Sequence, residues 1–146
     1  MNEIVVTRVT TPEERRAIEL IRRAVFQVEQ GIDPKIEFDG LDESADHVLA
    51  YLNQTPVGTA RIRYLEDTVA KIERLAVLLE ARHRGIGKKL MEKALEVAAK
   101  KGKTEAVIHA QEYVKRLHEQ LGFEVVSDRF YEAGIAHIKM KKSLLG

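Results

Sequence analysis

The sequence predicts an α+β fold in which a single sheet of mixed strand direction carries helices on its faces. Three observations lead to this fold class. Strand-like and helix-like segments follow one another in the order β, α, β, β, β, α, β, α, β, β; three of the strands are consecutive; and no repeat or linker divides the chain. A length of 146 residues is typical of one domain. We therefore expect residues 1–146 to form a single domain.

The N-terminal part predicts a strand, a helix and a long loop, in that order. Residues 4–9 alternate as a strand, and Thr11, Pro12 and Glu14 then provide an N-cap, a first-turn proline and a capping carboxylate for a helix whose apolar side chains recur at helical spacing. Periodicity is lost over residues 29–46, where glycines and a proline mix with seven carboxylates. This acidic loop is either a wall of a substrate site or a solvated connection.

The middle of the chain predicts an antiparallel meander of three strands. Residues 47–52 and 57–65 have the pattern of strands joined by a hairpin turn, and residues 69–77 form the third strand. A helix with one apolar face follows, starting near Gly85 and ending at Gly102. The elements expected after it are a strand over residues 105–110, a helix over 112–121, and two strands over 123–130 and 135–141.

Composition argues against several classes of function. The chain has no cysteine, which removes disulfides, a thiolate nucleophile and cysteine-type zinc sites, and its five histidines are scattered, so we expect no metal. No apolar run is long enough to span a bilayer, so we expect no membrane partner. The first residues lack the pattern of a secretory signal, which predicts a cytoplasmic protein. A net charge of +1 without a block of like charge predicts no nucleic-acid partner, although one helix face is rich in lysine.

Residues 82–87, Arg-His-Arg-Gly-Ile-Gly, lie between a strand and a helix and have the pattern of an anion-binding turn. The unpaired backbone N–H groups of a first helical turn bind pyrophosphate, and glycine lets the backbone come close. Two other phosphate motifs fail, because Leu90 stands where a dinucleotide fingerprint needs glycine and Lys89 where a P-loop needs serine or threonine. A tight turn with solvated basic side chains is the alternative. The candidate anion-binding residues are Arg82, His83, Arg84, Gly85, Ile86, Gly87 and Lys88.

The Arg-x-x-Gly-x-Gly pattern of residues 82–87, preceded by a strand that ends Leu-Ala-Val, resembles the acetyl-CoA pyrophosphate loop of the GNAT N-acetyltransferases. The segment from His118 to Phe123 resembles the aromatic-rich Tyr-x-x-Leu-Gly-Phe turn of that family, with histidine in place of tyrosine. Three further stretches resemble the ElaA-like branch of the family: residues 23–30 with 37–39, residues 58–63 and residues 134–138. The resemblance extends over nearly the whole chain.

The resemblance implies a mostly antiparallel sheet of six to seven strands flanked by helices on both faces. It also implies an enzyme that moves an acetyl group from acetyl-CoA to a primary amine of a small molecule or peptide by direct attack. Pantetheine would pair with the strand end at Leu75, Ala76 and Val77, where a backbone N–H would polarise the thioester carbonyl. The alternative is a module that binds an acyl-CoA as a sensor or scaffold without turnover. Edge strands at the end of the chain suggest a homodimer.

Direct transfer needs a base for the amine and an acid for the departing thiolate. By resemblance His137 is the first candidate base, and a histidine titrates near neutral pH. Glu73 is the rival base, with a cross-strand ion pair as its structural alternative. His118 takes the position of the family's tyrosine acid, but an ordinary imidazole is protonated in only a minority of molecules at neutral pH. An exposed helix histidine is the alternative for His118.

Two arginines are candidates for binding the acceptor. Arg61 and Arg63 share a strand face, on which they could bind a carboxylate, although a solvated strand face is equally expected. Phe26, within the ElaA-like stretch, completes the expected acceptor site. The acidic loop would favour a cationic amine and the two arginines an anionic amino acid, so the sequence leaves the acceptor open.

Overall fold

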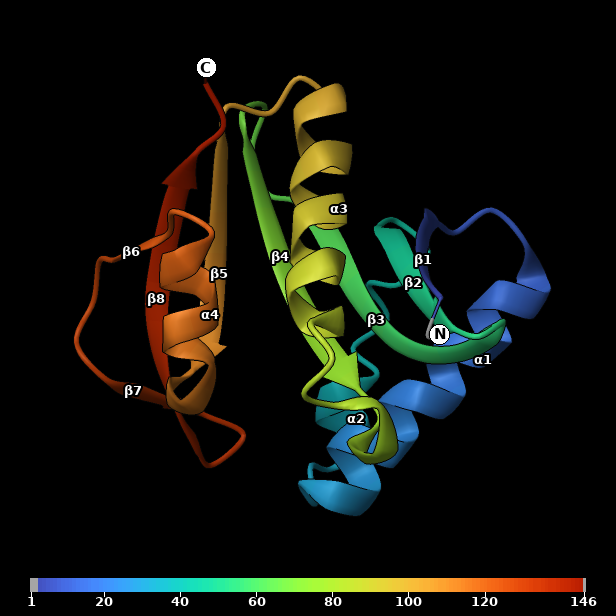
Figure 1. Cartoon of the computed structure of the whole chain (residues 1–146). Coiled ribbons are helices and arrows are strands. Elements are labelled where there is room, and N and C mark those ends of the chain that lie inside the picture. Colours follow the sequence, from blue (N-terminus) through green and yellow to red (C-terminus); the bar gives the residue numbers. More distant parts are fainter. Residues whose placement is uncertain (1–2, 146) are drawn as a thin grey trace.

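Eight strands form one mixed sheet in the computed structural model, which describes residues 3–145 (Figure 1). Within these residues the strand order is β1-β2-β3-β4-β5-β8-β6, and β7 also lies beside β8. All paired strands are antiparallel except β4 and β5. The strands are β1 Ile4–Arg8, β2 Asp46–Leu52, β3 Thr55–Tyr64, β4 Val69–Val77, β5 Glu105–Gln111, β6 Glu124–Val125, β7 Phe130–Glu132 and β8 Ile135–Ser143.

The predicted fold class is confirmed, and the sheet differs from the expectation only in its number of strands. The strand expected over residues 123–130 is interrupted: β6 pairs with Met140 and Lys141 of β8, whereas β7 pairs with residues 135–137. The connection between β6 and β7 bulges away from β8 (Figure 1). One expected strand therefore becomes two short ones, which raises the count from the seven strands of the predicted order to eight.

Helices cover both faces of the sheet. They are α1 Pro12–Arg22, a π-helix Arg23–Glu29, α2 Pro34–Glu37, α3 Ile86–Lys100 and α4 Lys115–Gln120, with 3-10 turns at Leu79–Ala81 and Glu112–Val114. α1 and the π-helix pack against Leu49, while α3 packs on the other face with Val48 and Ala50, because successive side chains of a strand point to opposite faces. In the part of the chain that the structure describes, no helix has the length and apolar character needed to cross a bilayer.

The capping box predicted at the start of α1 is present. Thr11 Oγ1 accepts a hydrogen bond from the Glu14 amide at 3.2 Å, and Glu14 Oε1 accepts one from the Thr11 amide at 3.1 Å. Both interactions satisfy amide groups that have no partner within the helix. The local signal in the sequence therefore fixes where α1 begins.

The acidic segment of residues 29–46 is more ordered than predicted. Asp33 accepts a hydrogen bond from the Lys35 amide at 2.8 Å and thereby caps α2. Three carboxylates of the segment form ion pairs with buried arginines instead of being solvated; they are Glu37, Asp39 and Asp42. The segment is therefore part of the packed structure, on the same face of the sheet as α1.

Gly58 fixes the position of α3 over the sheet. A Cβ atom at this position of β3 would lie 2.9 Å from Leu90 Cδ1 of α3 and 3.1 Å from the Ala76 carbonyl oxygen of β4. Only glycine permits this approach of the helix to the strand without a shift. The N-terminal half of α3 is therefore held close above β3 and β4.

The sheet opens between its two parallel strands. β4 and β5 pair only at Val69–Lys71 and Glu105–Val107; beyond these positions β4 continues beside β3 and β5 continues beside β8. Figure 1 shows β4 and β5 close together at one end and diverging toward the other. The edges of both strands beyond residue 71 of β4 and residue 107 of β5 therefore face the opening.

Candidate active site

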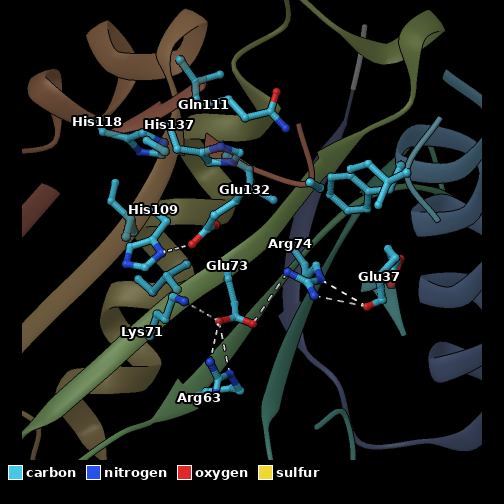
Figure 2. Close-up of a pocket in the computed structure, with 18 of the residues that line it drawn as sticks. Glu37, Arg63, Lys71, Glu73, Arg74, His109, Gln111, His118, Glu132 and His137 are labelled. Carbon is cyan, nitrogen blue, oxygen red and sulfur yellow. Dashed lines mark hydrogen bonds and ion pairs between the residues drawn. The ribbon is translucent and has the colours of Figure 1, made fainter. Parts of the chain in front are cut away.

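A cavity of about 430 Å³ lies where β4 and β5 diverge. Phe26 of the π-helix and Leu75 of β4 contribute to its apolar lining. Its polar lining residues include Arg63, Lys71, Glu73, Arg74, His109, Gln111, His118, Glu132 and His137. Figure 2 shows these side chains converging from both sides of the opening. A concave site in which polar groups converge beside an apolar lining is the usual form of a ligand pocket.

His137 lies on β8 and faces Gln111 of β5 and Phe130 of β7 in the strand register. Its Nδ1 is 2.7 Å from the Ile135 carbonyl oxygen, which can only accept a hydrogen bond, so Nδ1 carries the hydrogen. In the neutral ring, Nε2 then holds the free lone pair. The Phe130 ring stacks on the imidazole at 6.0 Å between centroids. The ring is thus fixed in one tautomer and one orientation.

Glu73 of β4 is surrounded by cations. Its carboxylate pairs with Arg61, with Arg63 at 3.1 Å and with Lys71 at 3.5 Å. Burial alone would raise its pKa, but the hydrogen bond and charge of Arg61 and the charges of Lys71 and Arg63 outweigh burial, so the pKa of Glu73 lies below its ordinary value. A carboxylate held in this way is a weak base, and the arrangement matches the cross-strand ion pair that was the structural alternative.

His118 of α4 lines the cavity but is nearly enclosed, with 3% of its surface exposed. The Phe123 ring contacts it edge-on at 5.8 Å between centroids, and among the described residues Nδ1 has no hydrogen-bond partner. Burial lowers the pKa of His118 to about 4. The side chain is therefore uncharged at neutral pH, and the expected imidazolium acid is not available there. The alternative of an exposed helix histidine does not hold either.

Arg61 does not face the cavity as expected. Its side chain is fully buried, and its guanidinium pairs bidentately with Asp39 at 2.8 Å, with Asp42 at 2.9 Å and with Glu73. The acidic segment covers this end of the strand face, which is why two arginines on one face have different environments. Arg63, two residues further along β3, does line the cavity. The predicted pair of acceptor-binding arginines is thus reduced to one.

A bulge in β4 shapes this wall. Arg61 pairs with Glu73 and Thr59 with Ala76, so β4 carries one extra residue, and Arg74 adopts a left-handed conformation with φ 56°. The Arg74 guanidinium donates to the Glu37 carbonyl at 3.3 Å and pairs with Asp39 at 3.2 Å. A positive φ at a residue other than glycine is strained, and such strain concentrates at functional sites.

The loop before α3 has the features of an anion site. His83 and Gly85 have positive φ of 63° and 78°, and α3 begins after Gly85 with no side chain capping its amides and no acidic residue in its first turn. Arg84, Lys88 and Lys89 surround these amides in sequence, which is unfavourable for the helix dipole unless an anion is present. The geometry therefore agrees with the anion-binding turn inferred from the sequence pattern.

Arg82 holds the same loop to its neighbours. Its Nε donates to the Val77 carbonyl at 2.9 Å, and its terminal nitrogens pair bidentately with Glu29 at 2.5 and 2.6 Å. The first contact ties the loop to the end of β4, and the second ties it to the end of the π-helix. Arg82 therefore fixes the position of the loop beside Leu75, Ala76 and Val77 at the end of β4.

Comparison with known proteins decides the family. The profile of the acetyltransferase (GNAT) domain matches residues 19–144. The uncharacterized protein YyaT of Bacillus subtilis is 36% identical over 142 residues, which cover 95% of each chain. Protein ElaA of Escherichia coli is 32% identical over 130 residues, covering 86% of this chain and 84% of ElaA. The chain belongs to the GNAT acetyltransferase family.

Solved GNAT structures share the fold of this chain. The crystal structure of Escherichia coli ElaA superposes with a TM-score of 0.81 and 28% identity, covering 97% of this chain and 99% of ElaA. An acyl-CoA N-acyltransferase from Pseudomonas aeruginosa gives a TM-score of 0.83 and 29% identity, covering 96% of this chain and 99% of that one. The predicted GNAT family with its ElaA-like branch is confirmed, and the chain is a GNAT-type N-acetyltransferase, of a family that uses acyl-CoA.

Several polar residues of this GNAT cavity were not predicted. His109 of β5 and Glu132 of β7 pair at 2.6 Å between Nδ1 and Oε1, and Lys71 and Arg74 join the cationic wall. Lys71 could have been predicted from the sequence, since it lies two residues before Glu73 and therefore on the same strand face. The pairing of His109 with Glu132 could not have been predicted from the sequence, because it depends on how β7 lies against β8.

Proposed function

We propose that this GNAT enzyme transfers an acetyl group from acetyl-CoA to a primary amine of a small molecule or peptide by direct attack within a single domain. The observation that carries the proposal is His137. Its Nδ1 is committed to the Ile135 carbonyl, which leaves Nε2 free in a cavity between the diverging β4 and β5. An imidazole held in this way presents a lone pair that can accept a proton from an amine.

The donor-binding residues are proposed on the features of the loop and of β4. The uncapped amides from Ile86 onward and the side chains of Arg84 and Lys88 would hold the pyrophosphate, with Gly85 and Gly87 allowing close approach. The edge of β4 at Leu75, Ala76 and Val77, which is not paired with β5, would hold pantetheine. Acetyl-CoA supplies the activated acyl carbon as a thioester.

The protein's own groups then move the protons. His137 Nε2 accepts a proton from the acceptor ammonium, and the free amine attacks the thioester carbonyl carbon. A backbone N–H on the edge of β4 stabilises the charge that develops on the carbonyl oxygen. When the carbon–sulfur bond breaks, the sulfur leaves with the electron pair and takes the second proton of the attacking nitrogen. The products are the amide, the thiol and the proton held by His137.

His118 and Glu73 receive different roles from the ones first considered. A buried and neutral His118 still carries one N–H, which could hydrogen-bond to the departing sulfur without transferring a proton. Glu73, which is surrounded by Arg61, Arg63 and Lys71, supports the wall of the acceptor site and is not the base. This leaves His137 as the base in the proposal.

Two measurements test the proposal in sequence. The thermal midpoint of the purified protein should rise with saturating acetyl-CoA and with CoA, and not with ATP or NAD, because a ligand bound only to the folded state stabilises it. Thiol release should then be followed with acetyl-CoA and a panel of primary amines. A rise in the midpoint without thiol release from any amine would favour the sensor or scaffold module, whereas the absence of any rise would refute the donor site.

A further inference from the structure

Two cations stand opposite each other in the cavity wall. Arg63 of β3 and Lys71 of β4 are direct partners in the strand register, and both line the cavity with partly exposed side chains. Like charges directly opposite each other in an antiparallel pair are destabilising. Glu73 relieves part of this repulsion, since its Oε1 lies 3.1 Å from Arg63 and 3.5 Å from Lys71. The same carboxylate is also shared with Arg61.

The charges around Glu73 do not balance. The network of ion pairs that includes this carboxylate joins five cations to four carboxylates: Arg22, Arg61, Arg63, Lys71 and Arg74 with Glu37, Asp39, Asp42 and Glu73. Arg22 and Arg61 are buried and each binds two or more carboxylates. Among the described residues, Arg63 and Lys71 each pair with one carboxylate, that of Glu73, which Arg61 and Arg74 also contact. Their positive charges are therefore the least neutralised of the network.

Away from Arg63 and Lys71, the middle and the far end of the cavity have a different character. Glu132 of β7 pairs with His109 of β5 at 2.6 Å, and His137 of β8 presents a free Nε2 beside them. Figure 2 shows His137 at one end of the group of polar side chains, Glu132 in the middle, and Lys71 and Arg63 at the other end. A carboxylate with two imidazoles suits an ammonium group, whereas two cations suit an anion.

The strand register gives the separation of the two ends. Lys71 is level with Val107 of β5, and His137 is level with Gln111, four residues further along the same strand. At about 3.3 Å per residue this separates the two backbone levels by roughly 13 Å. The Lys71 ammonium and the Arg63 guanidinium both contact the carboxylate of Glu73, which lies two residues further along β4 than Lys71. An acceptor with both charges has to span the remaining distance between these cations and His137.

We infer that the acceptor is an amine that also carries a carboxylate, an amino acid or a related amino carboxylate, with the carboxylate bound by Arg63 and Lys71 and the amine placed at His137. Arg63 offers a planar pair of donors that matches a carboxylate, and Lys71 adds a second charge. The inference rests on the proposed function, since it names the substrate class of the same site. It adds that the anionic group, rather than the amine alone, selects the acceptor.

Matched acceptors test the inference. Each amino acid in a series with two to five carbons between nitrogen and carboxyl carbon is compared with its carboxamide and its decarboxylated amine in the thiol-release assay. At least one acid should exceed its amide in kcat/KM by roughly tenfold or more, as expected for a charged hydrogen-bonded pair. The spacing that gives the highest value reports the distance between the two ends of the cavity. Equal kcat/KM for every acid and its amide would overturn the inference while leaving the transferase intact.

Substitution of Lys71 tests whether this residue binds the carboxylate of the acceptor. Lys71→Gln should lower the ratio of acid to amide kcat/KM several-fold, whereas Lys71→Arg should keep most of it. Lys100→Gln, the same change at the exposed last residue of α3, which pairs with Glu96 on the helix surface, should leave the ratio unchanged. A ratio that does not move in Lys71→Gln would assign the anionic group to other residues and refute the site. No turnover of any amine, with a normal response to acetyl-CoA, would instead refute the proposed transferase and the inference with it.

Discussion

Arg22 and Glu37 form a bidentate ion pair in which both side chains are almost completely buried, although they lie 15 residues apart in the chain. The pair joins the last turn of α1 to α2, with nitrogen–oxygen distances of 3.0 and 2.7 Å. The pair thereby holds the acidic segment of residues 29–46 in place over Arg61. Glu37 and Asp39 of this segment also line the cavity.

Replacing Arg22 by methionine should destabilise the protein by about 3–5 kcal/mol, because Glu37 is then left as a buried charge without a partner. The free energy of unfolding from urea titration measures the effect. Arg23→Met is the matched control, since the ion pair of Arg23 with Glu19 is exposed and its loss should cost less than about 1 kcal/mol. Similar losses for the two variants would contradict the role given to the buried pair.

Replacing His137 by alanine should lower kcat by roughly 10²–10⁴-fold through loss of the general base. The rise in thermal midpoint with acetyl-CoA should be kept, because donor binding is assigned to other residues. Amine acceptors with a lower pKa should lose less activity in the variant, since more of each is already unprotonated at neutral pH. An unchanged kcat with all acceptors would remove His137 from the mechanism.

Because His118 is buried, we expect the free energy of unfolding to decrease at mildly acid pH. Burial lowers its pKa to about 4, whereas the unfolded chain has an ordinary histidine pKa near 6.5. The unfolded state therefore binds a proton first, so this contribution to stability is complete above pH 6.5 and is lost as the pH falls toward 4, by about 3 kcal/mol.

The comparison of urea unfolding at pH 7 and pH 5 for the wild type and His118→Leu checks this prediction. The leucine variant should lose less stability on acidification. The leucine variant should still lose some stability between pH 7 and pH 5, because the pKa of His47 is also lowered, chiefly by burial. Identical pH dependence in the two proteins would mean that His118 is not the group responsible.

Replacing Gly87 by alanine should separate folding from donor binding. A Cβ atom at this position would meet only Leu117 Cδ2, at 3.6 Å, so the fold has room for it, and alanine favours a helix over glycine by up to about 1 kcal/mol. The thermal midpoint without ligand should therefore be unchanged or higher. The further rise caused by acetyl-CoA should be smaller, since a methyl group would obstruct the approach of the pyrophosphate. An undiminished rise would place the donor elsewhere.

Local features of the fold were predictable because their causes lie within a few residues. The capping box at Thr11 and Glu14 and the glycine-rich turn before α3 each follow from short-range geometry. The interruption between β6 and β7 was not predictable, because both strands obtain their partners from β8 and their own residues do not indicate where pairing stops.

The site was predictable only in part, for a related reason. His137 and the loop carry recognisable patterns. The environment of Arg61 depends on Asp39 and Asp42, which lie 22 and 19 residues away in a segment without periodicity. The pKa of His118 is set by enclosure, which depends on tertiary packing. Environments formed by distant segments decide protonation states, and a pattern along the chain does not contain them.

The limited pairing of β4 with β5 has a consequence for the stability of individual hydrogen bonds. Since only three residues of each strand meet, β1–β4 and β5–β8 are two smaller sheets joined at one end. Structures with such a seam open in separate cooperative units. Amide hydrogen exchange should therefore be faster along the facing edges of β4 and β5 than within β2 and β3, and a donor lying between the two sheets would slow exchange on both sides of the seam.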